Sequence, residues 1–255
     1  MKDYSKKEIL KKIKQKKELS GTADSVVEET LNNYITKYNL SISNLPSRQL
    51  KIIIKEVRAK LRSLTGQFQK TSKNRANFLS SPKALLKTHT STAERIKGYS
   101  KLKSIIKKIN PQSILDLGCG LNPIALASKK TKYYASDIKE DELDIIKQFF
   151  KKNKINGKTF VYDLRKISKQ DLPKADLCLI FKVLDIIDKN LSEKIILSIP
   201  CKKIMVSFST IKISGKRMNH PKRIWFEKIL ERKELKYKKF QIDNEVFYLI
   251  ENSNQ

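Results

Sequence analysis

Apolar residues recur three and four positions apart in three segments near the start of the chain: residues 3–18, residues 23–38, and a longer segment from Ser47 to Leu64. Residues at this spacing lie on the same side of a helix, so each segment is predicted to be an amphipathic helix. Lysine and arginine occupy most of the opposite face in the first and third segments. We expect a helical, basic domain over residues 1–88.

Short apolar runs separated by helical segments follow from residue 113 onward. Seven runs are predicted to be strands: residues 114–117, 132–136, 158–162, 175–181, 203–208, 237–242 and 245–250. Their alternation with helices indicates an α/β fold with a seven-stranded, mostly parallel sheet over residues 89–255. The run at 175–181 is the most continuously apolar, which is typical of a central parallel strand buried on both faces. The last two runs are predicted to form a hairpin.

The segment between the two regions has fewer apolar anchors. Residues 67–82 are predicted to be a linker, or a segment ordered by a partner, and residues 82–87 a short helix. Ser91 and Glu94 have the spacing of a capping box, in which the serine accepts from a first-turn amide and the glutamate bonds back. A helix is therefore predicted over residues 92–109, ended by Asn110 and Pro111.

The sequence Asp116-Leu117-Gly118-Cys119-Gly120-Leu121-Asn122-Pro123 predicts a strand, a tight turn and the start of a helix. Glycines allow the backbone to turn sharply and to approach a ligand, and the amides at a helix start favour polar or anionic groups. A turn without a ligand can use the same residues. The acid before the glycines, and proline in place of a third glycine, favour S-adenosylmethionine (SAM) over NAD, because D-x-G-x-G resembles the first motif of the Rossmann-like methyltransferases.

Two further polar residues follow predicted strands. Asp137 ends the second strand, about twenty residues beyond the glycine turn, where an acid can accept from ribose hydroxyls. Its alternative role is to cap the helix that follows. Lys182 stands at the carboxyl end of the predicted central strand, where open α/β sheets bind ligands, although a lysine there can also extend to solvent.

Composition adds a strong positive charge. The formal net charge is +29, and residues 41–90 hold eleven Lys or Arg against one acid, whereas residues 21–40 hold one Lys against three acids. A general lysine bias does not produce such blocks, so we expect nucleic-acid binding. Three groups are candidates for RNA contacts: the third helix, the following linker, and a glycine-containing loop at 209–219. Their residues are Lys51, Lys55, Arg58, Arg62, Lys70, Lys73, Arg75, Lys212, Lys216 and Arg217.

The remaining composition excludes several classes of protein. No run of about 18 apolar residues is present, so no membrane association is expected. Cys119, Cys178 and Cys201 are far apart and match no zinc spacing, which favours a reduced cytoplasmic protein without a structural metal.

Five strings resemble, in order and spacing, the aminoglycoside-resistance 16S ribosomal RNA methyltransferases of the Arm and Rmt type. They are residues 91–95 (STAER), 114–123 (ILDLGCGLNP), 181–184 (FKVL), 206–208 (VSF) and 225–227 (WFE). The resemblance implies a class I SAM-dependent methyltransferase that modifies N7 of a guanine in the decoding site of the small (30S) subunit. This sequence departs from the family pattern at two positions. It has Ala93 where the family usually has arginine, and Ser209 where the family usually has proline.

The resemblance also implies roles for individual residues. Arg95 would bind the carboxylate of SAM, Gly118 and Gly120 would let the backbone approach it, Asp137 would hold the ribose, and Asp163 with Leu164 would contact the adenine. Arginine is the natural bidentate partner of a carboxylate, and acids accept from hydroxyl and amino groups. Around them, the cofactor site is expected to include Asp116, Asn122, Ile138 and Phe181.

Guanine N7 carries a free lone pair, so its methylation needs no general base. Lys182 is expected to position the substrate. The alternatives are less consistent with the sequence: a cytosine-C5 enzyme needs a cysteine after the fourth strand, where this chain has Phe181-Lys182-Val183-Leu184, and the Asn/Asp-Pro-Pro-aromatic loop of amino-adenine enzymes is absent there. Methylation of transfer RNA or another RNA base, and a non-catalytic SAM-binding RNA or ribosome-assembly protein, remain open. A monomer is expected.

Overall fold

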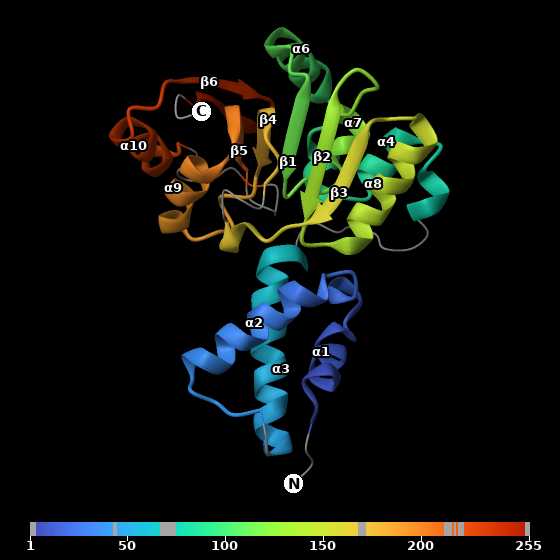
Figure 1. The fold of residues 1–255 in the computed structure, drawn as a ribbon, viewed down its shortest axis with the longest axis vertical. Coiled ribbons are helices and arrows are strands. Elements are labelled where there is room, and N and C mark those ends of the chain that lie inside the picture. The colour runs from blue at the N-terminus through green and yellow to red at the C-terminus, as the bar shows by residue number, and fades with distance from the viewer. Residues whose placement is uncertain are drawn as a thin grey trace.

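A seven-stranded sheet in the order β3-β2-β1-β4-β5-β7-β6 organises the computed structural model, which describes residues 4–42, 45–66, 75–167, 172–211, 216, 218 and 222–252 (Figure 1). The strands are β1 Ser113–Leu117, β2 Lys132–Asp137, β3 Gly157–Val161, β4 Ala175–Phe181, β5 Cys201–Ser209, β6 Tyr237–Ile242 and β7 Glu245–Glu251. The first five pair in parallel, and β7 pairs antiparallel with both β5 and β6. The predicted mostly parallel sheet with a terminal hairpin is confirmed.

Helices cover both faces of the sheet because successive side chains of a strand point to opposite sides. In β1, Ile114 packs in one cluster and Leu115 in the other. The first cluster includes side chains from α4 Pro82–Lys87, α6 Tyr99–Ile109, α7 Asn122–Leu126 and α8 Glu140–Asn153. The second includes side chains from α9 Lys189–Ser198 and α10 Ile224–Arg232. The sheet is therefore the middle layer of three.

Three N-terminal helices form a separate cluster of buried side chains. They are α1 Lys6–Lys14, α2 Asp24–Lys37 and α3 Ser47–Leu61, which are joined by apolar residues such as Ile13, Leu31 and Val57. The π-helical turn Arg62–Gly66 continues α3. We call residues 4–66 without 43 and 44 the helical unit. It lies below the sheet in Figure 1, beyond the edge at which β1, β2 and β3 end.

The segment between the helical unit and β1 follows its prediction only in part. The short helix predicted over residues 82–87 is confirmed as α4. The helix α5 Thr90–Glu94 has no side-chain cap, and residues 95–98 separate it from α6, so the predicted capping box and continuous helix are wrong. Glu94 instead pairs with Lys182, at 2.6 Å, which is a tertiary contact that local spacing does not reveal. Leu85 and Leu86 pack in a cluster with residues of the sheet, so α4 joins that layer although it precedes residue 89.

In the part of the chain that the structure describes, every helix is too short or too polar to cross a membrane.

Candidate active site

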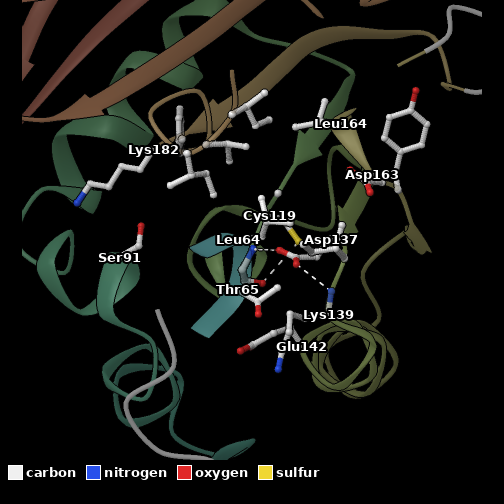
Figure 2. Close-up of a pocket in the computed structure, with 18 of the residues that line it drawn as sticks. Leu64, Thr65, Ser91, Cys119, Asp137, Lys139, Glu142, Asp163, Leu164 and Lys182 are labelled. Carbon is white, nitrogen blue, oxygen red and sulfur yellow. Dashed lines mark hydrogen bonds between the residues drawn. The ribbon is translucent and has the colours of Figure 1, made fainter. Parts of the chain in front are cut away.

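One pocket opens at the carboxyl edge of the parallel strands, and most of the residues predicted for the cofactor site line it (Figure 2). Its empty space, together with the open solvent at its mouth, amounts to about 900 Å³. The predicted residues in its wall are Gly118, Gly120, Asn122, Asp137, Ile138, Asp163, Leu164, Phe181 and Lys182. These come from the last residues of β2 and β4 and from the segments that follow β1, β2, β3 and β4. The fold thus brings together residues that are 64 positions apart in the sequence, since parallel strands end at the same edge.

The glycine turn after β1 forms the floor of the pocket. Gly118 and Gly120 have φ values of +64° and +49°, which side chains of other residues rarely tolerate. A Cβ atom on Gly118 would lie 2.6 Å from a methyl group of Val183, and one on Gly120 would lie 2.9 Å from the ring of His89. Both positions therefore require glycine for conformation and for space.

Asp137 joins the end of β2 to the glycine turn. Its Oδ2 accepts a hydrogen bond from the Gly120 amide at 2.9 Å, and its Oδ1 accepts one from the Lys139 amide at 3.0 Å. Burial raises the pKa of Asp137, although the Gly120 and Lys139 amides oppose that shift. The Lys139 bond resembles the capping role considered above, but a carboxylate has lone pairs left for a ligand hydroxyl.

Asp163 lies beyond β3 in the same wall and is held by Arg165. The Arg165 guanidinium contacts both carboxylate oxygens, with Nη2 2.6 Å from Oδ2 and Nε 2.9 Å from Oδ1. Leu164, between them, supplies an apolar surface. This combination of a fixed acid and an apolar side chain suits a flat heterocycle with an exocyclic amine.

Arg95 does not line the pocket, which corrects the prediction that it binds a ligand carboxylate. Its guanidinium is buried behind the wall, where Nε and Nη2 bond to Glu245 and Nη1 bonds to Asn122 Oδ1 at 2.6 Å. It also lies 4.9 Å from the centre of the Phe181 ring. Arg95 therefore supports two wall residues, Asn122 and Phe181, and its charge is already paired.

Asp116 also lies outside the wall, so the structure does not place it as a ligand contact. Its carboxylate points into the apolar layer on one face of the sheet and accepts a hydrogen bond from the Tyr133 hydroxyl at 2.7 Å. Burial raises the pKa of Asp116 to about 7, and the Tyr133 bond offsets only part of this effect. The acid of the glycine motif therefore anchors β1 to β2.

Lys182 lies at the pocket rim with a left-handed backbone, φ +60°. Its ammonium is 2.6 Å from Glu94 and 3.6 Å from Glu245. Burial alone raises the pKa of Glu245, but the charges of Arg95 and Lys182 outweigh this and lower it. Glu245 thus stays ionised between the two cations and holds both of them near the pocket.

Several wall residues were not anticipated from the sequence: Leu64, Thr65, His89, Ser91, Cys119, Lys139, Glu142, Tyr162, Arg165, Val183, Ile186 and Ile187. Ser91, Cys119 and Val183 lie within strings that the sequence analysis quoted, whereas the other wall residues lie outside every quoted string. Burial and the surrounding cations, Arg75 first, lower the pKa of His89 to about 3, so its imidazole is neutral at physiological pH.

Four of the residues predicted to contact RNA lie together on the helical unit. Lys51, Lys55, Arg58 and Arg62 all lie along one groove of the helical unit, together with Lys12 and Lys16 of the α1 side. Arg58 is half-buried because its guanidinium donates to the carbonyls of Lys12 and Ile13, at 3.2 Å for the latter. We call this surface the basic groove. Lys216 is exposed, and Lys70, Lys73, Lys212 and Arg217 lie outside the described residues.

Arg75 is the exception, and its predicted RNA contact is wrong. The side chain is buried, Nη1 lies 2.6 Å from Glu142 Oε1, and Nη2 donates to the Thr88 carbonyl at 3.0 Å. Its charge neutralises an acid that follows β2 and is not available to a phosphate.

A sequence profile of the ribosomal RNA methyltransferase (FmrO) family matches residues 58–250, well over half of the chain. The chain belongs to this family. The match to the rRNA methyltransferase profile begins within α3, so it includes the turn that carries Leu64 and Thr65.

Known proteins agree with that membership. A 16S rRNA (guanine(1405)-N(7))-methyltransferase of Serratia marcescens is 30% identical over 180 residues, covering 67% of this rRNA methyltransferase and 70% of the relative. A relative of the same name from Micromonospora rosea is 27% identical over 178 residues, covering 65% of this chain and 64% of the relative.

Solved structures show the same fold. The 16S rRNA methyltransferase RmtF in complex with S-adenosyl-L-homocysteine superimposes with a TM-score of 0.82 at 21% identity, covering 99% of this chain and 100% of that one. The 16S rRNA methylase RmtB gives 0.78 at 24% identity, covering 97% and 98%. The helical unit is part of this likeness, because nearly the whole chain is covered.

Proposed function

We propose that this rRNA methyltransferase transfers the methyl group of SAM to N7 of a guanine in the 16S rRNA of the small ribosomal subunit, the base that corresponds to guanine 1405 in the named relatives. The observation that carries the proposal is the meeting of the glycine turn, Asp137 and Asp163 around one pocket, with the basic groove on the adjoining helical unit. The cytoplasm is the compartment in which such a substrate is found.

The residues of the pocket fit SAM. The positive-φ glycines allow close approach of a ligand to the backbone, and Asp137 retains lone pairs that can accept from the ribose hydroxyls. Asp163 can accept from the adenine amino group, and Leu164, Ile186 and Ile187 can pack on its ring. Lys182 and Asn122 also line the pocket, and we assign to them the end at which the methionine part and the target base would meet.

When bound, SAM supplies a methyl group on a positively charged sulfur. The lone pair of guanine N7 can attack that carbon directly, so the protein has no proton to remove. The protein must still hold the base in line with the sulfur–methyl bond, exclude water, and keep the base out of the RNA stack. We assign the positioning of the base and its phosphates to Lys182 and to the loop that contains Lys212, Lys216 and Arg217.

The basic groove supplies the docking surface. Lys51 and Lys55 are exposed, and Arg62 pairs through its Nε with Glu18 at 2.8 Å. Phosphate contacts of this kind fix the orientation of an RNA without reading its sequence. We expect a monomer to act on the subunit, and a methyl group in the decoding site to hinder aminoglycosides that bind there.

The test is transfer of tritium from labelled SAM to three substrates offered separately: intact small subunits, naked 16S rRNA and transfer RNA. We expect label in rRNA and none in transfer RNA. Label in transfer RNA alone would favour the alternative substrate, and no label despite measurable SAM binding would favour a non-catalytic RNA-binding protein.

A further inference from the structure

Part of the wall of the cofactor pocket belongs to the helical unit. Leu64 and Thr65 lie in the turn Arg62–Gly66 and are 7% and 6% exposed. The Thr65 hydroxyl donates to the Leu61 carbonyl at 3.0 Å, which ties the turn to the last residue of α3. Figure 2 shows both side chains beside Asp137. A ligand in this pocket would contact both units of the protein.

A second connection joins the helical unit to the segment after β2. The Ala23 amide donates to the Ile138 carbonyl at 3.0 Å, and the Glu140 amide donates to the Gly21 carbonyl at 2.8 Å. The Lys139 ammonium reaches the Glu18 carbonyl at 3.1 Å. Asp137 is bonded to the Lys139 amide, so the proposed ribose-binding acid is held by a segment whose backbone is paired with the helical unit.

A third connection starts from the segment after β3. Arg165, which clamps Asp163, also donates from Nη2 to the Thr30 hydroxyl of α2 at 3.3 Å. The next residue, Lys166, pairs with Glu29 at 2.5 Å. Asp137 and Asp163 are therefore both positioned by segments that the helical unit contacts.

The basic groove lies on the same helix as this wall. Lys51, Lys55, Arg58 and Arg62 project from α3 and its extension, and Arg62 precedes Leu64 by two residues. An RNA phosphate held in the groove would fix the orientation of α3 and with it the turn that borders the pocket. The two binding events then share one element, α3 with its terminal turn, and coupling follows if RNA and cofactor favour the same position of that element.

We propose that the turn Arg62–Gly66 is a cofactor-binding element that couples rRNA docking on the basic groove to SAM binding, an inference that rests on the function proposed above. Small subunits bound by the helical unit tighten the pocket around the cofactor, and by reciprocity the cofactor tightens binding of the subunit.

Equilibrium dialysis of tritiated S-adenosylhomocysteine against the full chain, with and without saturating small subunits, measures the coupling directly. We expect the subunits to lower the dissociation constant about fivefold or more. Leu64→Ala should weaken binding without subunits and abolish most of the enhancement. The matched control is Leu45→Ala, which removes a leucine that is 5% exposed in the core of the same unit but away from the pocket. It should keep both the affinity and the enhancement.

An unchanged dissociation constant for the unsubstituted protein in the presence of subunits overturns the inference without reference to any variant. If small subunits still enhance the affinity of Leu64→Ala for S-adenosylhomocysteine, the turn Arg62–Gly66 does not carry the coupling. If Leu64→Ala unfolds at the assay temperature, Leu64→Val replaces it. Failure of the unsubstituted chain to bind S-adenosylhomocysteine at all would instead refute the proposed function, and the inference with it.

Discussion

The Arg95 guanidinium donates to both carboxylate oxygens of Glu245, from Nε at 3.0 Å and from Nη2 at 2.6 Å, although the two residues are 150 positions apart. The pair joins the turn between α5 and α6 to the first residue of β7, directly behind the pocket wall. Burial alone lowers the pKa of Arg95, but the Glu245 carboxylate outweighs burial and raises it above its ordinary value. The pair is therefore charged at every physiological pH.

Removing one partner of this pair should destabilise the protein strongly. Glu245→Ala leaves the Arg95 charge buried and unpaired, so we expect the free energy of unfolding in urea to fall by about 3 kcal/mol or more. The control is Glu28→Ala at the half-buried Lys6–Glu28 pair, where solvent screening should limit the change to less than about 1 kcal/mol. Equal effects of the two substitutions would contradict the assigned importance of the buried pair.

Lys182 should affect methyl transfer more than cofactor binding. Lys182→Gln removes the charge without requiring a new backbone conformation, and we expect single-turnover methylation of small subunits to slow ~10- to 100-fold because the target base is misplaced. Affinity for S-adenosylhomocysteine should change much less. Lys182→Arg should recover part of the rate. A glutamine variant that methylates at the normal rate would remove Lys182 from the substrate site.

The basic groove should dominate the salt dependence of RNA binding. The double variant Lys51→Ala, Lys55→Ala should weaken binding to small subunits and reduce the slope of log affinity against log salt by about 1 to 2. The control, Lys101→Ala with Lys103→Ala, removes two exposed lysines from α6, at the opposite end of the molecule (Figure 1). Equal slopes for the two double variants would place the RNA elsewhere.

Stability should respond to pH through Asp116. Its pKa is about 7 in the folded protein because of burial, above the ordinary 3.8, so the folded state retains a proton that the unfolded state loses. The carboxyl therefore costs stability increasingly as pH rises from about 4 to about 7. We expect the free energy of unfolding of Asp116→Asn, relative to that of the original protein, to rise by about 2 kcal/mol between pH 5 and pH 7. Urea unfolding at the two pH values measures this difference. A pH-independent difference would show that Asp116 is ionised throughout.

The fold was predictable from the sequence where the signal is local. The apolar run of β4 and the hairpin of β6 and β7 appear within a residue of their predicted ends, because continuous burial and the turn at Asp243, φ +49°, mark them directly. The glycine turn was also recognisable, since its backbone conformation restricts the residue type.

The predictions that were wrong concern residues that bond to side chains far away in the sequence. Glu94 has the spacing of a cap but pairs with Lys182, and Arg75 lies in a basic stretch but pairs with Glu142. Arg95 has the chemistry to bind a ligand carboxylate, but Glu245 occupies it. Leu64 reaches the pocket only because of how the helical unit packs against the sheet. Such contacts depend on tertiary geometry, which spacing along the chain does not encode.

Mapping the modified base tests the central claim most directly. Small subunits incubated with the protein and SAM would be treated with borohydride and aniline, which cleave RNA at N7-methylguanine, and the break located by primer extension. We predict one break, at a single guanine of the decoding site, that is absent without SAM and absent with an Asp137→Ala variant. Methyl label in the rRNA without N7-specific cleavage would contradict the account.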